Sequence, residues 1–193
     1  MWKKHPKALP FLFFSEMWER FGYYLMIGIF TLYLKDVKAG YAMTEAESAD
    51  LYGTFIALVF LTPFIGGLLA DRYLGYRKSI IMGGLMMGIG YCLMSVHNIA
   101  MLYLSMTLVI VGNGFFKPNI STLLGNVYTT PQYIKQKDDG YNIFYMGINI
   151  GAFVCNFFGA ALYIVYGWGA AFIAAGVGMF IGVAIFLIGT KHY

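Results

Sequence analysis

Two carboxylates and a guanidinium group stand within five residues of an otherwise apolar run. They are Glu16, Glu19 and Arg20 in the stretch SEMWERFGYY, and a further cation, Lys117, interrupts another apolar run. Carboxylates bind and release protons, and a basic group beside them stabilises the charged form. The chemistry open to this set is therefore proton exchange between acids and bases held at close range.

These four charges occur in a chain built for a lipid environment. Of its 193 residues 60% are apolar and 11% charged, with a mean hydropathy of +0.68, whereas about a quarter of the residues in soluble domains are charged. Six apolar runs reach the roughly 20 residues that cross a bilayer. We therefore predict an all-α membrane protein whose six transmembrane helices span residues 9–36, 46–70, 77–96, 100–125, 139–164 and 168–190. The first run is too long and too charged for a signal peptide, so we expect it to be retained.

The loops carry their positive charge asymmetrically. Nine Lys and Arg residues fall in the termini and in the loops that follow the second and fourth runs, while the opposite side has only Lys35 and Lys38. By the positive-inside rule, both termini are predicted to be cytoplasmic. The net charge of +4 reflects this asymmetry, and no nucleic-acid partner is expected.

Two local patterns predict how the helices start and pack. Thr44 and Glu47 have the spacing of a capping box at the start of the second run. Glycines four residues apart predict close helix packing in three runs. These pairs are Gly84 and Gly88, Gly147 and Gly151, and Gly178 and Gly182.

The charges of the first run lie on one side of a helix. At 100° per residue, an arc of about 140° holds a polar stripe, whose members are Glu16, Glu19, Arg20, Tyr23 and Tyr24. The opposite side is apolar, and we expect it to face lipid; its members are Phe14, Trp18, Phe21 and Leu25. A charge at the centre of a membrane helix costs about 2.5 to 3.5 kcal/mol, so the polar stripe must face protein or water.

Depth places polar groups of other helices near this stripe. At 1.5 Å per residue, Glu16 and Lys117 lie about 10 Å from the cytoplasmic ends of their helices, and Asn149 about 15 Å. Two interpretations stay open: a static ion-pair network that joins the first and fourth helices, or a working site. Pro118 and Pro63 lie inside predicted helices. The carbonyl four residues before each proline therefore lacks the backbone N–H that would donate a hydrogen bond to it.

Four segments, in order, resemble the proton-dependent oligopeptide transporter family of the major facilitator superfamily. The first is EMWERFGYY at residues 16–24, the family's E-x-x-E-R-F pattern, and the second is GGLLADRYLGYRKSI, the superfamily's motif after the second helix. The third is GNGFFKPNIST around Lys117, and the fourth is FYMGINIGAF, similar to the signature F-Y-x-x-I-N-x-G. The resemblance implies the N-terminal six-helix bundle of a twelve-helix transporter, with the substrate held between two bundles.

The resemblance also implies roles for individual residues. Proton coupling is assigned to Glu16, Glu19, Arg20 and Lys117, and peptide binding to Arg20, Tyr23, Tyr24, Lys117, Tyr145 and Asn149. An inner gate is assigned to Asp71, Arg72, Arg77 and Lys78. Phe60 stands where some bacterial members have a binding-site tyrosine. We expect a Glu16–Lys117 contact that breaks when proton and peptide enter.

The resulting prediction is half of a proton-coupled symporter for di- and tripeptides, with no cofactor other than the coupling proton. Its expected partners are membrane lipid and a second six-helix bundle, either a C-terminal half or another chain, and its expected location is the bacterial inner membrane. The alternative is an excised or stand-alone structural bundle that transports nothing without a partner. An enzyme is not expected, because Ser121 has no histidine on its side of the membrane and no metal-binding cluster is present.

Overall fold

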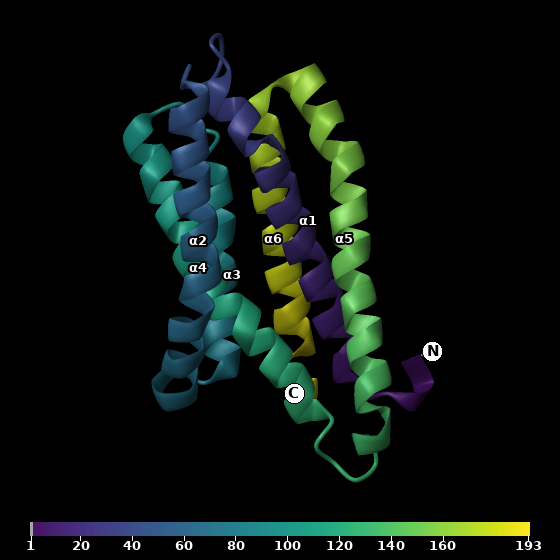
Figure 1. The fold of residues 1–193 in the computed structure, drawn as a ribbon. Helices are drawn as coiled ribbons and strands as arrows, with labels where there is room; N and C mark the ends of the chain where they lie inside the picture. The colour runs from purple at the N-terminus through teal and green to yellow at the C-terminus, as the bar shows by residue number, and fades with distance from the viewer. Residues whose placement is uncertain (1) are drawn as a thin grey trace.

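The computed structural model describes residues 2–193, and every regular element in that range is helical (Figure 1). Six long helices are α1 (Ala8–Lys35), α2 (Glu45–Leu69), α3 (Tyr76–Leu93), α4 (Ile99–Val127), α5 (Lys137–Tyr166) and α6 (Trp168–Gly189). The short elements are η1 (Trp2–Lys4), the π-helical η2 (Ala70–Leu74), η3 (Ile134–Gln136) and η4 (Thr190–His192). The prediction of six helices is confirmed.

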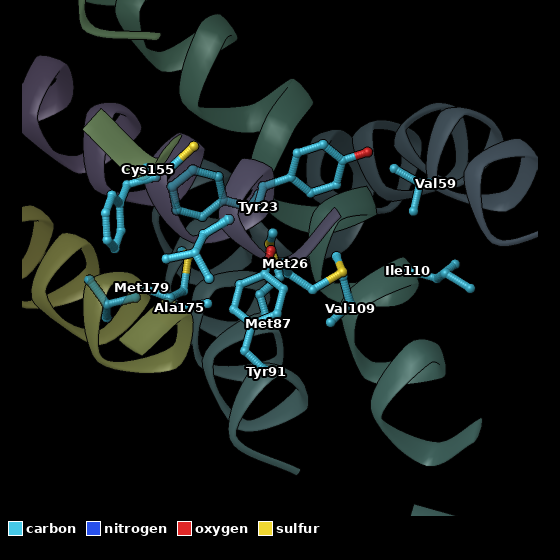
Figure 2. Close-up of a cluster of buried hydrophobic side chains, with 14 of the residues drawn as sticks. Tyr23, Met26, Val59, Met87, Tyr91, Val109, Ile110, Cys155, Ala175 and Met179 are labelled. Atoms are coloured by element: carbon cyan, nitrogen blue, oxygen red, sulfur yellow. The ribbon is translucent and has the colours of Figure 1, made fainter. Parts of the chain in front are cut away.

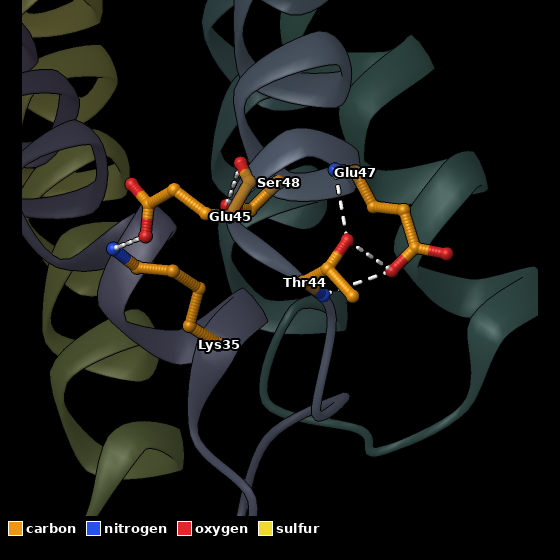
Figure 3. Close-up of polar contacts among 5 residues, drawn as sticks. All are labelled: Lys35, Thr44, Glu45, Glu47 and Ser48. Atoms are coloured by element: carbon orange, nitrogen blue, oxygen red, sulfur yellow. Dashed lines mark hydrogen bonds and ion pairs between the residues drawn. The ribbon is translucent and has the colours of Figure 1, made fainter.

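The start of α2 is the capping box expected from the sequence. The Thr44 hydroxyl oxygen accepts a hydrogen bond from the backbone N–H of Glu47 at 3.2 Å, and the Glu47 carboxylate accepts one from the backbone N–H of Thr44 at 2.8 Å (Figure 3). Two orphan donors of the first turn are thereby satisfied. An exposed ion pair at 2.9 Å between Lys35 and Glu45 joins the end of α1 to this turn.

Two glycines set the other sharp helix boundaries. Gly75 ends the π-helical turn with φ 75°, and Gly167 separates α5 from α6 with φ 84°. Both values lie in the left-handed region that a residue without a Cβ adopts at no steric cost. In the loop after α1, the Asp36 carboxylate accepts hydrogen bonds from the backbone N–H of Lys38 at 2.8 Å and from the indole N–H of Trp168 at 2.7 Å. This loop is therefore tied to the start of α6.

The helices form two groups of three. α1 lies between α5 and α6, while α3 lies between α4 and α6 and α2 packs on α4. Figure 1 shows α2, α3 and α4 on one side and α1, α5 and α6 on the other, with both termini at the same end. Four of the helical segments are long and apolar enough to cross a membrane: Glu45–Leu74, Ile99–Val127, Ile134–Tyr166 and Trp168–His192. The charges of α1 and the basic start of α3 lower their mean hydropathy.

The apolar side of α1 does not face lipid as expected. Phe21 and Leu25 are only 7% and 2% exposed, and only Phe14, at 41%, lies largely open. Glycines on the neighbouring helices explain the difference. A Cβ at Gly178 would lie 2.8 Å from the Phe21 ring, and one at Gly151 would meet the backbone of α1. Without those side chains α5 and α6 approach closely and cover α1, so the glycine pairs of α5 and α6 pack as predicted.

Buried apolar side chains from both groups of helices meet in one cluster. Figure 2 shows Tyr23 and Met26 from α1, Met87 and Tyr91 from α3, and Met179 from α6 in one cluster. In contrast, α2 and α5 bury few side chains. Their remaining apolar residues lie on the surface of the bundle.

Candidate functional site: a buried charge cluster and its neighbours

Glu16, Glu19 and Arg20 form one ion cluster inside the protein. The Arg20 Nε–H donates to a Glu16 carboxylate oxygen at 2.8 Å and lies 2.7 Å from a Glu19 carboxylate oxygen. The three residues are 2%, 0% and 4% exposed, so they are removed from both lipid and solvent. Their spacing on α1 brings them together, because residues three and four apart share one face of a helix. The guanidinium group thus balances two carboxylates within a single turn.

Several polar atoms of this cluster have no hydrogen-bond partner among the described residues. One oxygen of Glu16 is in this state, and both oxygens of Glu19 lack a bond of good geometry even though Arg20 Nε is close to one of them. The Tyr91 hydroxyl on α3, near Glu19, is likewise buried without a partner. A buried carboxylate oxygen with a free lone pair can accept a proton or a further donor. The cluster is therefore charge-balanced in part but not saturated with hydrogen bonds.

Lys117 lies near the cluster without joining it. No carboxylate oxygen lies within 4.0 Å of its Nζ among residues 2–193, so the expected Glu16–Lys117 contact is not made. Its Nζ lies instead 5.2 Å from the centre of the Phe60 ring on α2. Arg20, Glu19 and Glu16 remain close enough to interact with it electrostatically. Lys117 is thus a half-buried cation that no carboxylate holds in this structure.

The two helix-interior prolines explain how α2 and α4 are joined beside Lys117. Pro63 cannot donate to the Val59 carbonyl, and the side-chain amide of Asn113 on α4 donates to that oxygen instead, at 3.0 Å. One turn away, the Thr62 hydroxyl donates to the Ile110 carbonyl at 2.9 Å. Two inter-helix hydrogen bonds therefore fix the register of α2 on α4.

The second proline has a matching effect. Pro118 leaves the Gly114 carbonyl without its backbone donor, and this carbonyl lies against Gly66 of α2, where any Cβ would collide with it. The absence of a side chain lets the two backbones touch at this crossing. We call the contact region of Val59, Thr62, Gly66, Ile110, Asn113 and Gly114 the α2–α4 joint.

The predicted peptide-binding residues are divided between buried and open positions. Tyr23 is 7% exposed and its ring lies 5.7 Å from the Arg20 guanidinium, while Tyr24 beside it is 38% exposed. Tyr145 is 56% exposed on α5, and the Asn149 side-chain amide donates to its carbonyl at 3.1 Å. Tyr24 also lines a pocket of about 250 Å³ between α1 and α5. Tyr24, Tyr145 and Asn149 therefore lie on the open faces of α1 and α5, whereas Tyr23 is buried beside Arg20.

The predicted gate residues lie at the end of the bundle that holds the termini. Asp71 and Arg72 are exposed in the π-helical turn η2, and neither forms an ion pair with another described residue. The Arg77 guanidinium lies 5.9 Å from the Tyr193 ring, and Lys78 is exposed. The π-helical turn itself was not predicted. Such turns occur often at functional sites.

The sequence analysis did not predict the inter-helix hydrogen bond of Asn113 or the buried hydroxyl of Tyr91 near the charge cluster. Asn113 stands four residues before Lys117 in an apolar helix. A polar residue on the same face as an intramembrane charge could have been noticed. Tyr91 carried no such signal, because a tyrosine in a membrane helix is common as a packing residue.

Comparison with known proteins decides the family. The model of the family described as the POT family matches residues 77–193, which is more than half of the chain. The chain belongs to the POT family. Among the relatives of this POT family member is the dipeptide and tripeptide permease A of Citrobacter koseri, 41% identical over 186 residues, which cover 95% of this chain and 36% of the permease. An uncharacterized transporter of Bacillus subtilis, YclF, is 36% identical over 97% of this chain and 38% of its own length.

Solved structures give the same result for the fold. A crystal structure of peptide transporter POT in complex with sulfate matches with a TM-score of 0.93 and 36% identity, over 100% of this chain and 39% of that one. A POT family transporter in complex with 5-aminolevulinic acid matches with a TM-score of 0.94 and 29% identity, over 100% and 40%. The fold is thus the N-terminal six-helix bundle of a major facilitator superfamily transporter, in an integral membrane protein. The relatives are transporters rather than enzymes, and the chain spans less than half of their length.

Proposed function

We propose that this POT family chain supplies one half of a proton-coupled symporter for di- and tripeptides. The observation that carries the proposal is the buried cluster of Glu16, Glu19 and Arg20, with Lys117 unpaired beside it. Because the Arg20 guanidinium group pairs with both carboxylates, a proton on either carboxylate removes one of the two attractions on this guanidinium group. The similarity to the dipeptide and tripeptide permease A of Citrobacter koseri supports peptides of two or three residues as the substrate class.

In the proposed mechanism, Glu16 and Glu19 exchange the coupling proton, and Arg20 stabilises whichever carboxylate is charged. Lys117 takes the C-terminal carboxylate of the peptide, because its ammonium group forms no ion pair with a carboxylate of the described residues. Tyr23, Tyr24, Tyr145 and Asn149 contribute hydrogen-bonding groups from the faces of α1 and α5. Protonation weakens the attraction between the cluster and the cations, and the freed cations then favour binding of the substrate anion.

The remainder of the site belongs to a second six-helix bundle, which we propose packs against the open apolar faces of α2 and α5. Six helices alone enclose only one wall of a central cavity. We place the assembly in the bacterial inner membrane with both termini in the cytoplasm, on the strength of the loop charges. Asp71 and Arg72 then lie on the inner side, where we propose that they latch the inner gate, and Asp71→Asn should reduce transport. Uptake by Asp71→Asn equal to that of the parent would remove this role.

The test is uptake of a labelled dipeptide into proteoliposomes under an imposed proton gradient. The transporter that contains this chain should lose proton-driven uptake with Glu16→Gln or Glu19→Gln, yet keep exchange of peptide across a membrane without a gradient. Proton-driven uptake that survives both substitutions contradicts the proposal. Uptake by residues 1–193 alone would refute the requirement for a second bundle.

A further inference from the structure

The Lys117 ammonium group has an aromatic neighbour that the proposed function does not use. Its Nζ lies 5.2 Å from the centre of the Phe60 ring, within the roughly 6 Å at which a ring face attracts a cation. The guanidinium group of Arg20 repels the same ammonium group, while Glu19 and Glu16 attract it without coming within 4.0 Å of it. Phe60 is therefore the contact that Lys117 makes in place of a carboxylate.

The position of the ring is set by the α2–α4 joint. Phe60 directly follows Val59, whose carbonyl is bonded to the Asn113 amide at 3.0 Å. Lys117 stands four residues after Asn113, one turn further along the same face of α4. The hydrogen bond that replaces the one lost at Pro63 thus brings the ring and the ammonium group to the same level.

We propose that Phe60 is a positioning residue for Lys117. Its ring holds the ammonium group away from Glu16 and Glu19 and leaves the cation available for the carboxylate of the substrate. The proposal rests on the proposed function, since it assumes that Lys117 binds that carboxylate. Without the ring, the ammonium group turns toward Glu16 and Glu19, and a substrate carboxylate must then compete with them.

The test compares two ligands that differ only at the C-terminus, dialanine and its C-terminal amide, by their dissociation constants for the transporter that contains this chain. We expect Phe60→Leu to weaken dialanine about 2- to 30-fold, the range of cation–π interactions from exposed to desolvated sites. The affinity of the amide should stay unchanged. Phe60→Tyr keeps an aromatic face, so its dissociation constant for dialanine should equal that of the parent transporter.

Phe64 provides a matched control. It lies one turn after Phe60 on α2, is similarly exposed at 71% against 67%, and has no cation over its ring among the described residues. Phe64→Leu should change neither dissociation constant. A fluorinated ring in place of Phe60 keeps the shape but weakens the attraction for a cation, so it should weaken dialanine selectively even if Phe60→Leu folds poorly.

The outcomes separate this inference from the function on which it rests. If Lys117→Gln leaves the preference for dialanine over its amide intact, the assigned role of Lys117 fails. If Lys117→Gln abolishes the preference while Phe60→Leu and the fluorinated ring keep it, the positioning role of Phe60 alone is overturned. Equal weakening of both ligands by Phe60→Leu and by the fluorinated ring also overturns it, because the ring then acts only through packing.

Discussion

The hydrogen bond from Asn113 to the Val59 carbonyl should be needed only because Pro63 follows in α2. The Asn113 side chain and Val59 are each 1% exposed, and the bond measures 3.0 Å. Asn113→Leu removes the donor, keeps the branching of the side chain and leaves the carbonyl unpaired. Hydrogen bonds between membrane helices average about 0.6 kcal/mol and reach about 1.7 kcal/mol, and an unpaired buried acceptor costs about 1 to 3 kcal/mol. We expect Asn113→Leu to lower the free energy of unfolding by about 1 to 2 kcal/mol.

A second substitution makes this prediction specific. Pro63→Ala supplies the backbone N–H that bonds to the Val59 carbonyl within the helix, so Asn113→Leu should then cost less by about 1 kcal/mol. The measurement is reversible unfolding in mixed micelles by increasing sodium dodecyl sulfate, followed by tryptophan fluorescence.

Asn149→Leu serves as a control, because Asn149 is exposed and its side-chain amide donates to the Tyr145 carbonyl of its own helix, not to another helix. It should change stability by about 0.5 kcal/mol or less. An equal loss for Asn113→Leu with proline and with alanine at position 63 would refute the reasoning, since the Val59 carbonyl would then not be the group that Asn113 serves.

Tyr91→Phe removes a buried hydroxyl without a partner, so the same titration should show unchanged stability or a gain of up to about 1 kcal/mol; a loss would mean that the hydroxyl is bonded. Gly151→Leu forces a side chain onto the backbone of α1 and should cost about 2 kcal/mol or more, whereas Gly28→Ala meets nothing and should stay within about 0.5 kcal/mol. Two hydrogen bonds to the Asp36 carboxylate, the one with the larger effect from the backbone N–H of Lys38 and the other from the indole N–H of Trp168, hold the pKa of Asp36 below its ordinary value. Its stabilising effect should be complete above about pH 4 and be lost as the pH falls through the lower folded value. Asp36→Asn should flatten that part of a pH series of unfolding midpoints.

Features that depend on one helix were predictable from the sequence. Glu16, Glu19 and Arg20 meet because their spacing fixes them on one face, and Thr44 caps α2 because its partner Glu47 is three residues away. In both cases the interacting groups lie within one helical turn. Local spacing therefore carries the information that is needed.

Features that depend on two helices were not predictable in the same way. Hydropathy cannot distinguish a lipid tail from an apolar neighbour, so the buried side of Phe21 and Leu25 was assigned to lipid. The estimated depth in the membrane suggested that Lys117 and Glu16 lie at similar levels. The contact with Phe60, however, depends on the azimuth of α4, its rotation about its own axis relative to α2. That azimuth follows from the Asn113 bond and from backbone contact at Gly66. A single sequence does not encode it in any spacing.

The buried charges also have an electrical consequence. With both carboxylates ionised, the formal charges of Glu16, Glu19, Arg20 and Lys117 cancel, so the empty site presents no net charge to the membrane voltage. One added proton leaves a single positive charge, and one added carboxylate from a substrate cancels it again. Moving a unit charge through 100 mV changes the free energy by about 2.3 kcal/mol. Voltage would then act on this half of the site when it holds a proton alone, whereas its charges cancel when it is empty or holds both proton and carboxylate. The ammonium group of a zwitterionic peptide adds one positive charge that these four residues do not offset.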